Sequence, residues 1–434
     1  MRIRSAWYWL VPGMHVKRFV LLFIIGITLL FISLSTLLGA RGIRLVAGLE
    51  LAFERFFQRI LGPAFGSAVL VTAYAIAAGA ACLIMVVAAY QLMKSVIRPL
   101  AGSAPREPVA RTIYRYHRAG ALPHVVVIGG GTGIAPVIET LREENVLLTA
   151  IVTMADSGGS SGRLRDAAGI LPPGDFRNAL IAMAGESSRS ARLLSYRFPE
   201  HMEGIGGHNI SNLIIAALSD IKGNFGDAVQ EFAEVMQLPG RVLPMSLDSI
   251  RLKAHYTDGS TTEGEDQIPL QNKVIEGIEI LPNHAKPFVP ALESLAKADS
   301  IIIGPGSLFT SLIPPLSIEA TADTIARSAA IKVLVVNAMT ERGETDSYTA
   351  GMHLHRIEQV LGRQCIDMVL LNRTPFPSDV LAKYAAAGVH PVENDLGHMR
   401  RPRVIEADIC SSRDNYIRHD SAKLRRVLRV LLGL

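Results

Sequence analysis

Short, fully apolar runs alternate with amphipathic stretches from residue 124 onward. The runs lie in the segments 124–133 (HVVVIGGGTG), 147–156 (LLTAIVTMAD), 298–307 (ADSIIIGPGS), 332–340 (KVLVVNAMT) and 366–372 (IDMVLLN). Helical stretches such as 134–144 and 318–330 separate them. Short apolar runs without polar alternation are typical of strands that are buried on both faces. The pattern therefore predicts an α/β domain with a mostly parallel sheet and helices on both faces.

One part of the domain departs from this pattern. Residues 241–281 contain shorter pieces around RLKAHYTDGSTTEGEDQI, with a turn signal at Asp258 and Gly259. We expect this segment to form a small antiparallel insertion. At the C-terminus, residues 423–434 (KLRRVLRVLLGL) are apolar and basic at helical spacing, which fits either a helix that docks on a bilayer or a closing helix packed on the domain.

Two apolar segments precede the domain. Residues 19–38 carry no charge, and residues 65–93 lie in an uncharged stretch rich in Ala, Val, Ile and Leu. Runs of about 20 apolar residues are typical of membrane-spanning helices, so we expect residues 1–98 to form a two-helix membrane anchor. A cleaved secretory signal is the alternative for the first run, but its apolar core is longer than such signals have. Between the runs, residues 41–62 fit either an amphipathic helix on the bilayer surface or a solvent loop.

The charge distribution predicts the orientation of this anchor. Basic residues exceed acidic ones in 1–18, 41–59 and 94–118, so the positive-inside rule places both ends of the anchor in the cytoplasm. We therefore expect a multi-pass protein of the inner (cytoplasmic) membrane whose C-terminal domain, 124–434, lies in the cytoplasm behind a Pro- and Arg-rich linker, 99–123. The chain has a formal charge of +5 although these three segments carry more than that, so the domain itself is acidic and nucleic-acid binding is not expected.

The chain has three cysteines, far apart in sequence, and no Cys/His spacing typical of zinc sites. A phosphate-binding P-loop and the Gly-x-Ser-x-Gly elbow of hydrolases are also absent from the sequence.

The first candidate loop joins the first strand of the domain to a helix. Glycines allow the backbone to approach a phosphate, and the start of the following helix attracts an anion. The dinucleotide fingerprint is incomplete because Ile134 stands at its third glycine position, and a tight turn needed only for packing is the alternative. The ligand-binding candidates here are Gly129, Gly130, Gly131, Thr132 and Gly133.

The second candidate loop follows the next strand. Asp156 ends that strand, where its carboxylate suits a magnesium ion, a ribose hydroxyl or the proton of an attacking alcohol. Glycine amides, serine hydroxyls and arginines then follow, which suits an oxygen-rich anion, although a mobile surface loop is the alternative. Beyond Asp156, the candidates are Ser157, Gly158, Gly159, Ser160, Ser161, Arg163 and Arg165.

Two further candidate loops precede helices. In LPPGDFRNAL, Asp175 is either an N-cap or a ligand contact, and Arg177 beside Asn178 places a cation at a helix start, where it is unfavourable unless an anion lies nearby. In GGHNISNL, His208, Asn209 and Asn212 are candidates to orient a sugar, ribose or base, with helix capping or a structural histidine as the alternatives.

The last two candidate loops follow later strands. Gly304, Gly306 and Ser307 form a second glycine turn before a helix, and Asn337 and Thr340 follow the next strand. Since ligands of open α/β sheets bind at the carboxyl ends of the strands, two anion-binding turns on one sheet edge favour a diphosphate or a nucleotide.

Six motifs in this order (GGGTG, ADSGGSSGRLR, LPPGDFRNAL, GGHNISNL, IIIGPGSLFTSLIP and NAMTERGETDSY) resemble the family of 2-phospho-L-lactate transferase-like proteins and gluconeogenesis factors. The resemblance covers about 300 residues and implies a Rossmann-like fold. One branch of the family transfers a phospholactyl group from an activated nucleotide with magnesium. The other is similar to regulators that bind UDP-N-acetylglucosamine and influence cell shape, envelope synthesis and gluconeogenic growth.

The motifs around GGSSGRLR and LPPGDFRN are similar to the second branch. At Ser157 this chain departs from a second aspartate that the family pattern has, which weakens a metal-bridged transfer and leaves Asp156 as the one carboxylate there for an ion. We therefore expect a membrane-tethered, homo-oligomeric protein that binds a nucleotide-diphosphate sugar. A magnesium-dependent phospholactyl-type transferase is the alternative, and an NAD-dependent oxidoreductase is a third reading that the missing glycine disfavours.

Overall fold

The computed structural model describes residues 122–155, 171–185, 188–397, 399, 401–413 and 416–434, together with scattered residues between 44 and 76. The chain divides into two compact units, Met1–Ala121 and Leu122–Leu434. Among the described residues, no helix combines the length and the apolar character needed to cross a bilayer. The predicted spans 19–38 and 65–93 lie outside the described residues, apart from Thr72 and Ile76.

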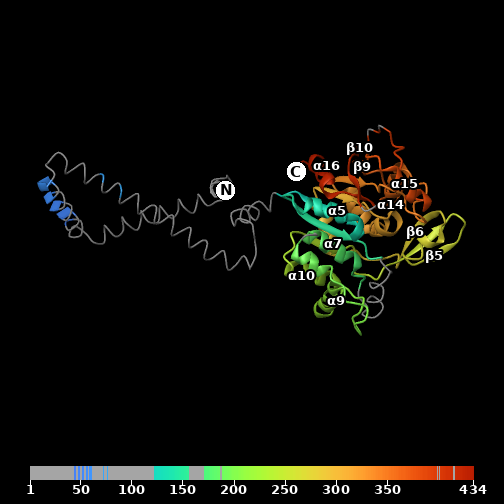
Figure 1. Ribbon diagram of the computed structural model, residues 1–434, viewed down its shortest axis with the longest axis horizontal. Coiled ribbons are helices and arrows are strands. Elements are labelled where there is room, and N and C mark those ends of the chain that lie inside the picture. Colours follow the sequence, from blue (N-terminus) through green and yellow to red (C-terminus); the bar gives the residue numbers. More distant parts are fainter. Residues whose placement is uncertain are drawn as a thin grey trace. The chain divides into compact units, whose positions relative to one another are not determined.

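A parallel sheet of seven strands forms the centre of the unit that begins at Leu122 (Figure 1). The spatial order is β10-β9-β8-β7-β1-β2-β3. The predicted α/β class and mostly parallel sheet are therefore confirmed. The bounds are β1 His124–Gly129, β2 Leu147–Val152, β3 Arg241–Pro244, β7 Ser300–Ile303, β8 Ile331–Val335, β9 Met368–Asn372 and β10 Arg403–Ala407.

The two central strands, β1 and β7, are completely buried along their apolar runs. Residues 125–128 and 301–303 have no exposed surface. Val125 pairs with Leu148 on one side and with Ser300 on the other. A strand that is covered on both faces and paired at both edges has no polar alternation, so its sequence is a continuous apolar run. This is why both strands could be predicted from the sequence.

The segment 241–281 is only partly the antiparallel insertion that we expected. Its first residues form β3, which pairs in parallel with β2 at the edge of the main sheet. The antiparallel sheet begins at Arg251 and has the order β5-β4-β6, with β4 Arg251–Tyr256, β5 Thr261–Glu263 and β6 Ile275–Leu281. The turn at Asp258 and Gly259 joins β4 to β5, and Gly259 has a positive φ of 80°.

The strand order reverses between β1 and β7, as in doubly wound sheets. Before the reversal, α5 (Gly131–Leu141) and α7 (Gly174–Ala184) contact each other and strands β1 to β3. After it, α11 (Val289–Ala296) contacts β1 and packs against α13 (Glu319–Arg327). Right-handed crossovers in opposite directions place these two groups on opposite faces of the sheet. The remaining helices are α8 Arg189–Leu194, α9 Ile210–Lys222, α10 Phe225–Val235, η3 Pro269–Gln271, η4 Leu308–Leu312, α12 Ile313–Leu316, α14 Ala350–Val360 and α15 Ser378–Ala386.

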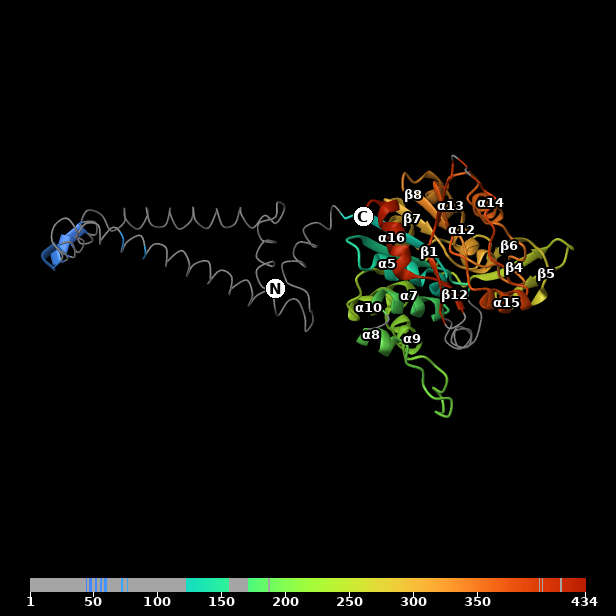
Figure 2. The ribbon, with the colours of Figure 1, turned by 45° about the horizontal axis from the view of Figure 1, so that its top comes forward.

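The chain ends with a hairpin and a helix that return to the first helix of the domain. Strands β11 (Cys410–Arg413) and β12 (Tyr416–His419) precede α16 (Ser421–Leu432), which lies alongside α5 (Figure 2). Leu424 and Leu428 of α16 are fully buried, and Arg425 forms an ion pair with Glu144 at 2.7 Å. The structure therefore agrees with the second alternative for this basic helix, a closing helix packed on the domain.

Candidate functional site

The two glycine turns lie side by side because their strands are neighbours. Strand β1 pairs in parallel with β7, so the loops that follow them, at Gly129–Gly133 and Gly304–Ser307, leave the same edge of the sheet. This is also where the strand order reverses. In doubly wound sheets, ligands bind in the crevice at such a reversal.

The start of α5 is pressed against its neighbours at two glycines. A Cβ on Gly131 would lie 1.8 Å from the carbonyl oxygen of Asp175, and a Cβ on Gly133 would lie 2.4 Å from that of Pro305. Packing therefore explains the absence of side chains at these two positions. The same close approach brings the first turn of α5 against the first turn of α7 and the loop after β7.

A polar cavity of about 480 Å³ opens at this junction. The N-termini of α5 and α7 border it, and no side-chain N-cap closes either of them in the described part of the chain. The first-turn amides of a helix have no partner within the helix and attract anions. The cavity is lined by Gly130, Thr132, Gly133, Thr153, Gly174, Asp175, Arg177, Asn178, Arg197, Glu265, Gly306, Ser307, Thr310, Ser311 and Glu341.

Polar side chains link the two helix starts across this cavity. The amide nitrogen of Asn178 donates to the Thr132 hydroxyl at 2.7 Å, and the Arg177 guanidinium donates to the amide oxygen of Asn178 at 3.0 Å. Arg177 is therefore a cation held in the first turn of α7, beside the cavity. A positive charge there opposes the helix dipole, so this position favours a bound anion.

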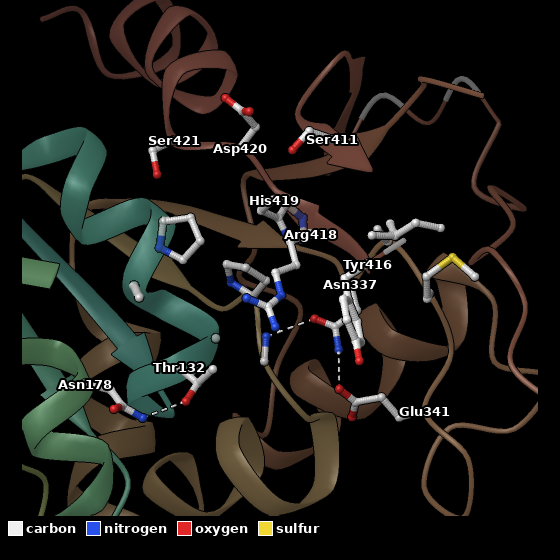
Figure 3. A pocket seen from close by; sticks show the side chains of 18 of the residues that line it. Thr132, Asn178, Asn337, Glu341, Ser411, Tyr416, Arg418, His419, Asp420 and Ser421 are labelled. Atoms are coloured by element: carbon white, nitrogen blue, oxygen red, sulfur yellow. Dashed lines mark hydrogen bonds between the residues drawn. The ribbon is translucent and has the colours of Figure 1, made fainter. Parts of the chain in front are cut away.

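Asn337 joins the loops after β7 and β8. Its side-chain oxygen accepts a hydrogen bond from the Gly306 amide at 2.9 Å, and its side-chain nitrogen donates to Glu341 at 3.2 Å (Figure 3). Thr340 is held differently, since its amide donates to the His390 carbonyl at 2.7 Å and its hydroxyl accepts from the His390 amide at 3.0 Å. Thr340 borders the large cavity, but both of these hydrogen bonds are made with the backbone of His390.

A second cavity, of about 1330 Å³, adjoins the first. Both are lined by Thr132, Gly133, Asn178, Gly306 and Glu341. Its far wall is the C-terminal hairpin, from which Tyr416, Arg418 and His419 reach it, and Figure 3 shows Arg418 extending toward Asn337. Burial lowers the pKa of His419 to about 4, so this side chain is neutral near pH 7.

The hairpin residues were not predicted from the sequence. Tyr416, Arg418 and His419 lie in a segment without a glycine turn or a strong apolar run. Glu341 was also missed, although it follows a candidate loop by a few residues. The nearest signal for Glu341 was the polar cluster after β8, which contains the candidates Asn337 and Thr340.

A buried pair of carboxyl groups lies beside the two cavities. Burial raises the pKa of Glu341, and burial together with the neighbouring charge of Glu341 raises the pKa of Glu344 to about 8. The Thr310 hydroxyl donates to Glu344 at 3.2 Å. A second oxygen of Glu341 and the Thr153 hydroxyl are buried in the cavity walls without a hydrogen-bond partner in the described structure.

The three predicted residues around the start of α9 border neither cavity. The side chain of Asn209 accepts from the Ser211 amide at 2.8 Å and caps α9, as the capping alternative had it. His208 Nδ1 and both amide atoms of Asn212 are buried, and in the described part of the chain none of these atoms has a hydrogen-bond partner. Neither residue borders the cavities described above.

The second candidate loop lies outside the described residues. It comprises Asp156, Ser157, Gly158, Gly159, Ser160, Ser161, Arg163 and Arg165. The described chain stops at Ala155, close after Thr153 in the wall of the small cavity, and resumes at Leu171. In the part of the domain that is described, no cluster of three His, Cys, Asp or Glu side chains could hold a metal ion.

Comparison with known proteins places this site in a family context. Residues 125–410 match the family model described as 2-phospho-L-lactate transferase CofD. A putative gluconeogenesis factor of Nostoc sp. is 36% identical over 431 residues, which cover 98% of this chain and 92% of that protein. A putative gluconeogenesis factor of Thermoanaerobacterium thermosulfurigenes is 42% identical over 71% of this chain and 97% of its own length. The crystal structure of a UPF0052 family member from Bacillus halodurans has a TM-score of 0.67 at 38% identity, covering 70% of this chain and 99% of that one.

Proposed function

Because the chain belongs to the 2-phospho-L-lactate transferase CofD family, among its gluconeogenesis-factor members, we propose that it binds a nucleotide-diphosphate sugar of the UDP-N-acetylglucosamine type. The diphosphate occupies the small polar cavity. The nucleoside and the sugar extend into the large one.

One observation carries this proposal: the uncapped N-termini of α5 and α7 border a single polar cavity at the reversal of strand order. A second supports it independently. In the described structure, the Thr153 hydroxyl and an oxygen of Glu341 are buried in the wall of that cavity without partners. Because buried polar atoms are ordinarily paired, these two atoms favour a polar ligand that completes their hydrogen bonds.

The dimensions of the large cavity suit the rest of such a ligand. Its volume of about 1330 Å³ exceeds that of typical small-molecule sites, which reach about 1,000 Å³. Arg418 and Arg342 border it together with the aromatic rings of Tyr384 and Tyr416. Aromatic rings suit stacking with a base, and guanidinium groups suit phosphate oxygens.

We propose that the protein acts as a membrane-tethered regulator of envelope synthesis, cell shape or carbon partitioning. The name of the Nostoc relative, a putative gluconeogenesis factor, supports the metabolic part of this role. The uncharged runs 19–38 and 65–93 support a two-span anchor in the inner membrane with the domain in the cytoplasm. We also propose that the protein is a homo-oligomer.

Calorimetric titration of the purified full chain in detergent tests the binding. UDP-N-acetylglucosamine is expected to bind with a Kd in the micromolar range, and free N-acetylglucosamine, which lacks the diphosphate, is expected not to bind. Titration with UDP and with GDP-mannose separates the contribution of the diphosphate from that of the base. The absence of a binding signal with every diphosphate ligand at millimolar concentration would refute the proposal.

A second candidate function is phospholactyl-type transfer, which the description of the matching family model favours. An alcohol oxygen would attack the distal phosphorus of the donor, the phosphoanhydride bond would break, and a nucleoside monophosphate would leave. Asp156 would accept the alcohol proton or hold a magnesium ion, which would supply charge neutralisation at the phosphates. This function predicts magnesium-dependent release of nucleoside monophosphate, and unchanged turnover in Asp156→Asn would eliminate it.

A further inference from the structure

Glu341 lies in the wall that the two cavities share, and one of its two carboxyl oxygens already accepts a hydrogen bond. The amide nitrogen of Asn337 donates to Oε1 at 3.2 Å, and the Ser307 hydroxyl also donates to this carboxyl group. The other oxygen, Oε2, is buried and has no partner in the described structure. A single carboxyl oxygen is thus left for whatever occupies the cavities.

Glu344 is the neighbour that decides the charge of this carboxyl group. It is 8% exposed and does not border either cavity, and the Thr310 hydroxyl and the Phe309 amide donate to it. Glu265 adds a further negative charge nearby. Two buried carboxyl groups at close range resist double ionisation, so the pair tends to keep one proton.

Cations around the cavities do not neutralise the pair. Arg177 and Arg197 line the small cavity, and Arg342 and Arg418 line the large one, together with the neutral His419. In the described part of the chain none of them forms an ion pair with Glu341 or Glu344. Among the described residues, the other negative groups that face the cavities are Glu139, Asp175, Glu265 and Asp420.

An ionised Glu341 would therefore present an unpaired negative oxygen to an anionic ligand. This is unfavourable because a buried charge without a partner is costly and because the two negative charges repel each other. A protonated Glu341 would instead present an O–H group that needs an acceptor, and a phosphate oxygen supplies one. We propose that Glu341 recognises the diphosphate as a neutral acid that donates a hydrogen bond from Oε2, so that ligand binding takes up a proton when the pair is ionised. This inference rests on the proposed ligand site.

The sign of the pH dependence follows from this assignment. Burial and the charge of Glu341 raise the pKa of Glu344 to about 8, and burial raises the pKa of Glu341 as well. Once the pair in the free protein has lost the proton that the complex needs at Glu341, affinity falls as the pH rises, by up to about tenfold per pH unit. At lower pH the proton is already present, and affinity becomes constant.

Calorimetry of the full chain with UDP-N-acetylglucosamine at about pH 6 and about pH 9 tests this proposal. The diphosphate of this ligand is esterified at both ends and does not titrate over that range. Affinity is expected to be at least about tenfold lower at the higher pH. Titrations in two buffers of different ionisation enthalpy are expected to show uptake of up to one proton per ligand at the higher pH.

Two isosteric variants assign the proton. Glu341→Gln carries a permanent neutral donor, so it is expected to bind more tightly than the wild type at about pH 9 and to vary by less than about threefold over the range. Glu344→Gln is the matched control. Without the neighbouring charge, Glu341 ionises at lower pH, so the fall in affinity is expected to begin at lower pH than in the wild type.

Several outcomes would overturn the proposal. Affinity that is independent of pH, or no proton uptake at about pH 9, refutes it. Loss of binding in Glu341→Gln together with a requirement for Mg²⁺ would make Glu341 a metal ligand instead. Infrared spectra of the ligand-free protein distinguish failure of this proposal from failure of the proposed ligand. If the protein binds no UDP-sugar but shows a neutral-carboxyl band at about pH 7 that is lost in either Gln variant, the protonated acid pair exists and only the proposed ligand is refuted.

Discussion

The amide of Gly306 donates a hydrogen bond to the side-chain oxygen of Asn337 at 2.9 Å, which ties the loop after β7 to the loop after β8. The same Asn337 side chain donates to Glu341 at 3.2 Å. One side chain therefore positions both the second glycine turn and the acid that faces the cavities. The arrangement depends on the neighbouring places of β7 and β8 in the sheet.

Asn337→Ala is expected to loosen this edge of the sheet. The substitution leaves the Gly306 amide without its acceptor and removes one of the donors to Glu341, so the free energy of unfolding is expected to fall by about 1–2 kcal/mol. Affinity for UDP-N-acetylglucosamine is expected to fall about tenfold. Urea unfolding and calorimetry measure the two effects. Asn283→Ala, at an exposed position, is the control, and equal behaviour of the two variants would contradict this role of Asn337.

Gly131→Ala is expected to disrupt the junction of α5 and α7. A Cβ at this position would lie 1.8 Å from the Asp175 carbonyl oxygen, so one of the two helix starts must move. Overpacking of this kind costs about 1–3 kcal/mol. Gly277→Ala is the matched control because a Cβ there meets nothing within 4 Å. A melting temperature of Gly131→Ala equal to that of the control would show that the two helix starts are not in close contact.

Arg177→Gln is expected to weaken ligand binding without destabilising the fold. The cation lies in the first turn of α7 beside the small cavity, where it opposes the helix dipole. We expect at least about a tenfold loss of affinity and a change in unfolding free energy of no more than about 0.5 kcal/mol. Arg192→Gln on the exposed surface of α8 carries the same change of charge and is expected to bind normally. A large loss of stability with unchanged affinity would assign Arg177 a structural role.

His419 is expected to make the domain less stable in acid. Burial lowers its pKa to about 4, whereas an unfolded histidine titrates near about 6.5. As the pH falls between these values, the unfolded chain takes up a proton that the folded chain does not, so stability decreases by about 1 kcal/mol per pH unit.

The measurement is urea unfolding at several pH values in this window, comparing the wild type with His419→Gln. The variant is expected to lose this part of the pH dependence. His284→Gln, at an exposed position, is expected to keep it. A wild-type slope that survives in His419→Gln would mean that other groups cause the acid sensitivity.

The central strands were predictable from sequence because their burial is complete. Strands β1, β2, β7, β8 and β9 correspond to the apolar runs noted in the sequence. Strand β3 was assigned to the insertion because its four residues, RVLP, directly precede a polar segment. Strand β10, RVIEA, has no fully buried residue and therefore lacks a continuous apolar run.

The candidate site was only partly predictable because part of it is assembled from distant segments. The glycine turns signal their positions locally, and parallel pairing of β1 and β7 brings them together. The wall formed by Arg418 and His419 depends on α16 packing against α5. No pattern of adjacent residues encodes such a contact. The alternatives at Asn209 could be resolved only by the hydrogen bond that its side chain makes.

A density map of the full chain with bound UDP-N-acetylglucosamine tests the central claim most directly, by crystallography or electron microscopy. The proposed function predicts the diphosphate at the N-termini of α5 and α7, within hydrogen-bond distance of Thr132 or the first-turn amides, and next to Glu341. Density for the diphosphate elsewhere on the domain, with the small cavity holding only water, would contradict it.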